Sequence, residues 1–217
     1  MNLFEYGRIN EQKKNAPLAR RMRPEKLEDF VGQTEIIGHG KLLRRAIEAD
    51  QISSIIFFGP PGVGKTALAQ IIAQCTRAEF IRLNAVAAGI NEIRQVVNEA
   101  KDRLGMYGKK TILFIDEIHR FNKAQQDALL PYVEEGLITL IGATTENPYF
   151  EINSALLSRS QIFRLHKLSP QELERVLDRA LRDKEKGYGN LNIRIDVKAK
   201  QHIIEKSDGD ARKVLNA

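Results

Sequence analysis

The residues that could do chemistry begin with an eight-residue stretch, Gly59-Pro60-Pro61-Gly62-Val63-Gly64-Lys65-Thr66. It follows the apolar run 55–58 and precedes a helical pattern over 67–72. Its small residues let the backbone curl so that successive N–H groups point at a polyphosphate, and the N-terminus of the next helix adds its positive dipole end. The stretch matches every fixed position of the P-loop pattern, in the strand, loop and helix order that makes a match specific.

The P-loop pattern gives individual residues a role. Lys65 is predicted to bind the β and γ phosphates of a nucleotide, and the Thr66 hydroxyl is predicted to bind Mg²⁺. The predicted nucleotide contacts from this stretch are Gly59, Pro60, Pro61, Gly62, Val63, Gly64, Lys65, Thr66 and Ala67. The alternative is a glycine-rich turn before an ordinary helix, which a chance match would seldom place between a buried strand and a helix.

A second group of candidate residues follows the apolar run 111–115, which ends in Asp116 and Glu117. In a P-loop ATPase the first carboxylate holds Mg²⁺ through water, and the second takes a proton from the attacking water. Thr144 and Thr145 end the apolar run 137–143, and a hydroxyl there would lie beside the acidic pair if the sheet is parallel. His119 has no partner at metal-ligand spacing, so we predict a packing or hydrogen-bonding role for it.

The elements that must position these residues alternate between strands and helices. Apolar runs predict strands over 55–58, 80–83, 111–115, 137–143 and 161–165, and helical patterns separate them. This order predicts an α/β fold, a parallel sheet flanked by helices. The pattern over 123–135 predicts a helix that Pro131 kinks or ends.

A change of pattern marks the C-terminal part of the chain. Ser169-Pro170-Gln171-Glu172 is a capping box, and only helical patterns follow it. We therefore expect a mobile N-terminal arm over 1–20, an α/β nucleotide-binding domain over 21–167, and a small all-helical lid domain over 168–217. Since the last helical pattern starts only after Gly209, we expect the lid to be truncated.

Composition bounds the class of protein. The chain has 217 residues, 42% of them hydrophobic and 29% charged, as in an ordinary globular protein. Its sequence has no apolar run long enough to span a bilayer and no export signal, so we expect a cytoplasmic protein. The single Cys75 excludes an intramolecular disulfide and is predicted to have a packing role. Residues 161–217 hold thirteen Lys and Arg against nine Asp and Glu, which fits nucleic acid binding and a solvated lysine-rich face equally.

Together these residues resemble the AAA+ ATPases, in the group that contains clamp loaders and the Holliday junction motor. Within that group the chain is similar to the family of the replication-associated recombination protein RarA, or MgsA, and the Werner helicase-interacting protein. The segments that carry this likeness are Asp116 to Pro131 and Gly142 to Pro148. The resemblance covers nearly the whole chain, and it implies a P-loop NTPase fold of the AAA+ type with ATP or ADP and Mg²⁺ as cofactors.

The resemblance also implies roles for residues outside the P-loop. Thr145, with Thr144 as the alternative, matches the first sensor, and Arg159 matches the arginine finger that enters a neighbour's site. Arg212 matches the second sensor, which also contacts the nucleotide, and Asn84 matches the residue that holds the catalytic Glu117 inactive. The segment that cups the adenine in this group corresponds to Arg23, Pro24, Val31 and Gly32.

Two departures disfavour a clamp loader. Clamp loaders have cysteine after the finger arginine, where this chain has Ser160, and the zinc-binding cysteines of their bacterial motor subunits are absent from the sequence. The alternatives that stay open are a clamp loader subunit or branch-migration motor, and a nucleotide-gated binding module with little turnover. Such modules usually lose the catalytic glutamate or the finger, and this chain has Glu117 and Arg159.

The resemblance implies an ATPase of replication and recombination that remodels DNA or protein at stalled forks in the bacterial cytosol, near the nucleoid. Expected partners are single-stranded ends or forked DNA and replication proteins such as single-strand binding protein, with no membrane contact. A homo-oligomer is expected of the full-length protein. The 217-residue chain by itself is expected to be mainly monomeric and a weak ATPase.

Overall fold

The computed structural model describes residues 15–191 and 193–217. Contacts divide the described residues into two compact units: residues 33–166, and residues 15–32 together with 167–191 and 193–217. Most of the predicted mobile arm, residues 1–14, lies outside the described residues. Over the described ranges, no helix has both the length and the apolar character that a membrane crossing needs.

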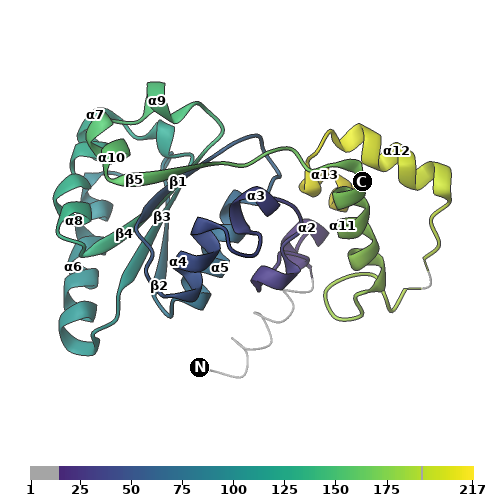
Figure 1. The fold of residues 1–217 in the computed structure, drawn as a ribbon, viewed down its shortest axis with the longest axis horizontal. Helices are drawn as coiled ribbons and strands as arrows, with labels where there is room; N and C mark the ends of the chain where they lie inside the picture. Colours follow the sequence, from purple (N-terminus) through teal and green to yellow (C-terminus); the bar gives the residue numbers. More distant parts are fainter. Residues whose placement is uncertain (1–14, 192) are drawn as a thin grey trace. The chain divides into compact units, whose positions relative to one another are not determined.

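The unit of residues 33–166 is built on a five-stranded sheet (Figure 1). Its strands are β1 (Ser54–Phe58), β2 (Glu79–Asn84), β3 (Thr111–Asp116), β4 (Ile138–Thr144) and β5 (Ser160–Arg164). All neighbouring strands are parallel, in the order β2-β3-β4-β1-β5, which confirms the predicted α/β class with a parallel sheet. The carboxyl ends of all five strands therefore meet at one edge, where the candidate residues of three strands come together.

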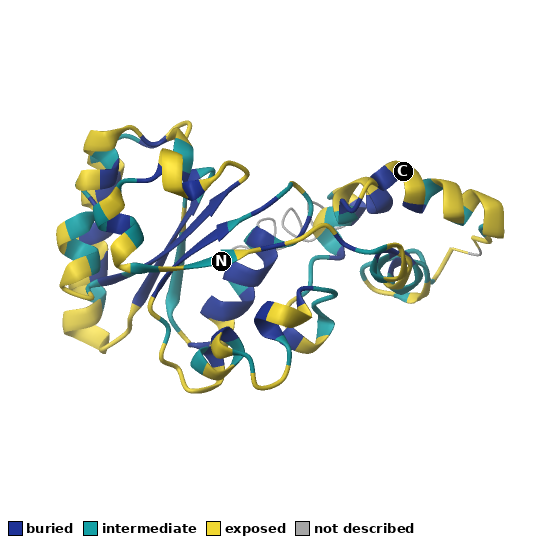
Figure 2. Ribbon diagram, turned by 45° about the horizontal axis from the view of Figure 1, so that its top comes forward, coloured by how far each residue is buried: buried dark blue, intermediate teal, exposed yellow. Residues whose placement is uncertain are grey.

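Helices cover both faces of this sheet, with α4 and α5 on one face and α6 and α8 on the other (Figure 1). The helices of the unit are α3 (Thr34–Ile37), α4 (Leu42–Glu48), α5 (Lys65–Cys75), α6 (Ile90–Tyr107), η2 (Ile118–Arg120), α7 (Lys123–Asp127), α8 (Leu130–Glu134), α9 (Pro148–Glu151) and α10 (Ser154–Ser158). The central strands are buried on both faces (Figure 2). Strands covered on both faces read as continuous apolar runs, which is why the sequence predicted them well.

Two predictions for this unit need correction. The helix expected over 123–135 is two helices, because Pro131 lacks an N–H for a helix interior and lies instead in the first turn of α8. Cys75 does not pack in the core: it is exposed at the C-terminal end of α5, because the buried face of that helix is filled by apolar residues such as Leu68, Ile71 and Ile72.

The other unit consists of helices from the two ends of the chain. They are α2 (Leu18–Arg21), η1 (Leu27–Asp29), α11 (Pro170–Arg182), α12 (Val197–Ser207) and α13 (Ala211–Asn216). The predicted capping box starts α11, where the Glu172 N–H donates to Ser169 Oγ over 3.3 Å and the Ser169 N–H donates to Glu172 Oε2 over 2.7 Å.

Residues 15–32 belong to this helical unit rather than to an arm or to the sheet. Leu18 and Met22 are buried in one cluster with Ala180 and Leu215, and the Arg179 guanidinium donates to the Asp29 carbonyl over 2.9 Å. The contact-defined boundary therefore falls at Gln33, not at residue 21 as expected. Contacts between residues 150 to 197 positions apart set it, and a local sequence pattern does not show such contacts.

Candidate active site

The P-loop joins β1 to α5 through glycines whose backbone conformations other residues could not easily adopt. Gly62 and Gly64 have φ angles of 74° and 101°. Gly59 has a φ of 150°, and a Cβ there would lie 2.2 Å from the Leu165 carbonyl oxygen. The loop is therefore curled tightly against the residue that follows β5, as the predicted phosphate cradle requires.

Lys65 lies inside this curl. Its side chain is buried, and its ammonium donates to the carbonyls of Gly59 at 2.6 Å and Pro60 at 2.9 Å. Lys65 and Thr66 form the first turn of α5, an 11-residue helix whose N-terminal end points its free N–H groups toward the loop. A positive charge, a helix N-terminus and curled backbone amides thus converge where a polyphosphate would bind.

Asp116 ends β3, in register with Asn84 of β2 and Ala143 of β4. Its Oδ2 lies 2.5 Å from Nη2 of Arg82, whose guanidinium also lies over the Phe114 ring at 5.9 Å. The predicted Mg²⁺ ligand therefore already has a cationic partner from the neighbouring strand. Arg82 could not be predicted from the sequence, because its place beside Asp116 depends on the register between β2 and β3.

Glu117 follows Asp116 in the left-handed backbone region, with a φ of 52°. Its Oε2 lies 3.4 Å from both the N–H and the hydroxyl of Thr145, and 3.3 Å from Nδ1 of His119. Thr144 is fully buried, and its hydroxyl lies 2.8 Å from His119 Nδ1. Of the two candidate hydroxyls, that of Thr145 is therefore the one beside the carboxylate, and His119 has the hydrogen-bonding role predicted for it.

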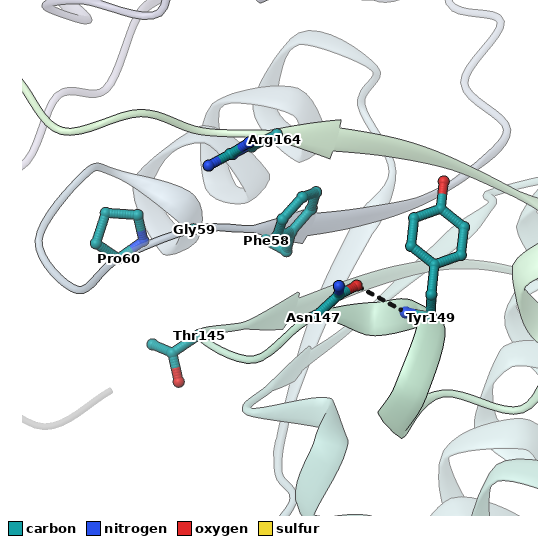
Figure 3. Close-up of a pocket in the computed structure, with 7 residues that line it drawn as sticks. All are labelled: Phe58, Gly59, Pro60, Thr145, Asn147, Tyr149 and Arg164. Atoms are coloured by element: carbon teal, nitrogen blue, oxygen red, sulfur yellow. Dashed lines mark hydrogen bonds between the residues drawn. The ribbon is translucent and has the colours of Figure 1, made fainter.

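A cavity of about 500 Å³ connects the start of the P-loop to the residues after β4 (Figure 3). It is lined by Phe58, Gly59, Pro60, Thr145, Asn147, Tyr149 and Arg164. Asn147 caps α9 by accepting from the Tyr149 N–H at 3.1 Å. Of the lining residues, Phe58, Asn147, Tyr149 and Arg164 were not predicted from the sequence. Asn before Pro is a helix-start signal that could have placed α9 next to Thr145.

Other predicted residues do not join this cluster. Arg159, at the end of α10, pairs with Glu134 at 2.6 Å and donates to the Ala155 carbonyl at 2.9 Å. Asn84 accepts from the Val86 N–H at 3.0 Å, and within residues 15–191 and 193–217 no hydrogen bond joins it to Glu117. The remaining predicted residues belong to the helical unit: Arg23, Pro24, Val31, Gly32 and the exposed Arg212.

The donor set fits the predicted cofactors. Thr66 and Asp116 offer a hydroxyl and a carboxylate, the hard oxygen ligands that Mg²⁺ prefers. Across the part of the chain that the structure describes, no three His, Cys, Asp or Glu side chains gather at one point. Mg²⁺ in nucleotide sites usually takes only one or two protein oxygens and completes its shell with phosphates and water, so the two residues are sufficient.

Comparisons with known proteins agree with this geometry. Residues 55–168 match the model of the "ATPase family associated with various cellular activities (AAA)". The chain is 50% identical over 200 residues to replication-associated recombination protein A of Escherichia coli (strain K12), covering 92% of this chain and 44% of that protein. It is 44% identical over 215 residues to ATPase WRNIP1 of Dictyostelium discoideum, covering 99% of this chain and 24% of that protein.

A solved structure extends the likeness to the fold. The RuvB Holliday junction branch migration motor of Thermotoga maritima superposes with a TM-score of 0.71 at 27% identity, covering 90% of this chain and 63% of that one. The chain spans less than half the length of the curated relatives described above.

Proposed function

Because the chain belongs to the AAA family of ATPases, in the group of replication-associated recombination protein A and ATPase WRNIP1, we propose that it binds ATP at the P-loop and hydrolyses it. One observation carries the proposal. The unit of residues 33–166 holds the buried Lys65 inside a curled P-loop and, at the same edge of the sheet, Glu117 beside the Thr145 hydroxyl.

The predicted site residues of this unit divide the steps of the reaction between them. The loop amides and Lys65 bind the β and γ phosphates, and Thr66 and Asp116 would hold Mg²⁺. Bound Mg²⁺ would neutralise phosphate charge as the transition state develops. Glu117 accepts the proton of the attacking water, and the Thr145 hydroxyl orients that water as the first sensor.

Residues outside this cluster complete the proposed site. Arg159 acts as an arginine finger in the site of a neighbouring copy, a role supported by its place outside the lining of the cavity. Arg23, Pro24, Val31 and Gly32 enclose the adenine, Arg212 serves as the second sensor, and Asn84 restrains Glu117 between turnovers. These roles rest on the match to the family pattern.

The biological role we propose is remodelling of DNA or protein at stalled replication forks, as part of replication-associated recombination. It is supported by 50% identity to a protein of that name. In this role the full-length protein acts as a homo-oligomer in the bacterial cytosol on forked or single-stranded DNA, with single-strand binding protein among its partners. A branch-migration motor is the second candidate, supported by the TM-score of 0.71 to RuvB.

The test is the ATPase rate of the protein with single-stranded, double-stranded, forked and four-way junction DNA, each against a sample without DNA. We expect forked DNA to raise the rate most, while four-way junction DNA would do so if the protein is a branch-migration motor. Glu117→Gln is the control and should abolish the activity with every DNA. Equal rates with and without all DNAs would contradict the proposed role and leave only the ATPase.

A further inference from the structure

His119 lies between the carboxyl ends of β3 and β4, and the proposed reaction gives it no step. Its side chain is only 11% exposed, with Nδ1 2.8 Å from Thr144 Oγ1 and 3.3 Å from Glu117 Oε2. The turn η2 that carries it is held by Ile118, which is fully buried. Gly142 of β4 makes room for the Ile118 side chain, since a Cβ at residue 142 would lie 3.0 Å from Ile118 Cδ1. The ring is therefore fixed in place by packing.

The hydroxyl of Thr144 decides which way the hydrogen bond to His119 runs. Thr144 is fully buried, and its Oγ1 already accepts from the Glu146 N–H at 3.0 Å. Among the described residues, His119 Nδ1 is the only other partner of this hydroxyl. A buried hydroxyl proton without an acceptor costs about 1–3 kcal/mol. Thr144 therefore donates to an unprotonated Nδ1, and the neutral ring carries its proton on Nε2.

This arrangement shapes the surroundings of Glu117. Glu117 Oε2 lies 3.3 Å from His119 Nδ1. An unprotonated Nδ1 has a lone pair and no proton at this point, so it limits how closely the carboxylate approaches and forms no hydrogen bond with it. The contacts to the N–H and hydroxyl of Thr145, at 3.4 Å, are longer than ordinary hydrogen bonds. Glu117 itself has a φ of 52°, a conformation that non-glycine residues keep only when their surroundings impose it.

We propose that His119 is the positioning residue for Glu117. Anchored on the Thr144 hydroxyl, its ring holds the carboxylate against Thr145 and leaves both carboxylate oxygens without a ring N–H partner, ready to accept a proton from water. The inference rests on the proposed function, because it concerns the residue assigned there as the base.

Three substitutions separate this role from simple packing. His119→Asn keeps an acceptor oxygen at the place of Nδ1, whereas His119→Gln moves the amide one carbon further along the side chain. Thr144→Val keeps the shape of threonine and removes the donor. We expect His119→Gln and Thr144→Val each to lower kcat by roughly 10-fold to 100-fold, since small misplacements of a catalytic group have effects of this size. ATP affinity should stay at the wild-type value.

The pattern across these variants is the readout. His119→Asn should recover most of the turnover that His119→Gln loses, and the double variant His119→Gln/Thr144→Val should be no slower than the slower single variant, because both remove one interaction. Additive losses, or equal losses of kcat and ATP affinity in all variants, would overturn the positioning role. So would wild-type turnover in both His119→Gln and Thr144→Val.

A measurement on the unaltered protein keeps the inference testable if a variant fails to fold. The ¹⁵N chemical shifts of the His119 ring should show Nδ1 unprotonated and Nε2 protonated at neutral pH. A protonated Nδ1 would overturn the inference. Wild-type ATPase activity with Glu117→Gln as reference tests the proposed function separately: absence of hydrolysis, or full activity in Glu117→Gln, would refute that function whatever the ring shows.

Discussion

The P-loop and the carboxylate edge both lie at the ends of strands of one sheet, yet they are built differently. The carboxylate edge consists of Asp116, Glu117 and Thr145. The P-loop is shaped by backbone, with glycines in conformations that few other residues adopt and a lysine bound to loop carbonyls at 2.6 and 2.9 Å. The carboxylate edge is shaped by side chains, with the half-buried Asp116 paired to Arg82 and the half-buried Glu117 held by contacts of 3.3 to 3.4 Å.

This difference teaches how binding and hydrolysis are divided. A curled backbone and a helix N-terminus are preorganised for phosphate and lie in one subunit. The carboxylates must exchange or tighten their partners before they can act, as catalytic contacts often do only in the reacting complex. One subunit should therefore suffice to bind ATP, while hydrolysis needs the bound nucleotide and a neighbouring copy.

The largest effect should come from Arg159, which is proposed to act in the site of a neighbouring copy and not in its own. Arg159→Ala is expected to lower turnover by about 10³-fold to 10⁵-fold, because an arginine finger stabilises transition-state charge. Mixing Arg159→Ala with Lys65→Ala subunits should restore part of the activity, since at one class of interface each supplies what the other lacks. If mixed oligomers form and never exceed either variant alone, the site is not shared between copies.

Glu117→Gln should have the next largest effect. The amide keeps the shape of the side chain and cannot accept a proton, so single-turnover hydrolysis should fall by roughly 10²-fold to 10⁴-fold. Glu205→Gln, the same exchange at an exposed position of α12 in the helical unit, is the matched control and should hydrolyse at the wild-type rate. Undiminished turnover of Glu117→Gln in assembled protein would assign the base to another residue.

Arg82→Gln tests whether the pairing of Asp116 competes with Mg²⁺. Removing the guanidinium frees the carboxylate, so the Mg²⁺ concentration for half-maximal binding of nucleotide, followed by calorimetry, should fall about 1.4-fold to 5-fold. This range corresponds to the 0.2–1 kcal/mol typical of an exposed ion pair. Arg82→Lys keeps the charge and serves as the control. A higher Mg²⁺ requirement in Arg82→Gln would mean that Arg82 assists the metal site.

The last prediction concerns the stability of the helical unit rather than nucleotide binding or turnover. The Asp183 carboxylate accepts from the N–H groups of Lys186 at 2.7 Å and Glu185 at 2.9 Å, and these bonds lower its pKa below the ordinary value of 3.8. The bonds stabilise the fold above pH 3.8, and this stabilisation is lost as the pH falls through the lower folded pKa.

Asp183→Ala should therefore reduce the free energy of unfolding by about 1 kcal/mol at pH 7, the scale of one or two hydrogen bonds. Urea titrations should show the difference shrinking as the pH falls below 3.8. A difference that is the same at pH 7 and at pH 3 would show that the charge of Asp183 plays no part.

Local patterns were enough to predict the five strands, the P-loop and the capping box of α11, because each of these patterns lies within a few consecutive residues. The alternation of strands and helices was enough to predict that the sheet is parallel. The pairing of Arg82 with Asp116 and the bridge from His119 to Thr144 could not be predicted, since they depend on which strands are neighbours and in what register. The same holds for Leu18 and Met22, whose partners Ala180 and Leu215 lie at the other end of the chain.

The most direct test of the division between the two regions is the equilibrium affinity for ATP and Mg²⁺ of Lys65→Ala and Glu117→Gln, measured by calorimetry beside the wild type. Lys65→Ala should bind roughly 10-fold to 100-fold more weakly, because it loses a charged hydrogen bond to phosphate. Glu117→Gln should bind as tightly as the wild type. If both variants bind like the wild type, or if both lose affinity to the same extent, binding and hydrolysis are not divided between the P-loop and the carboxylate edge.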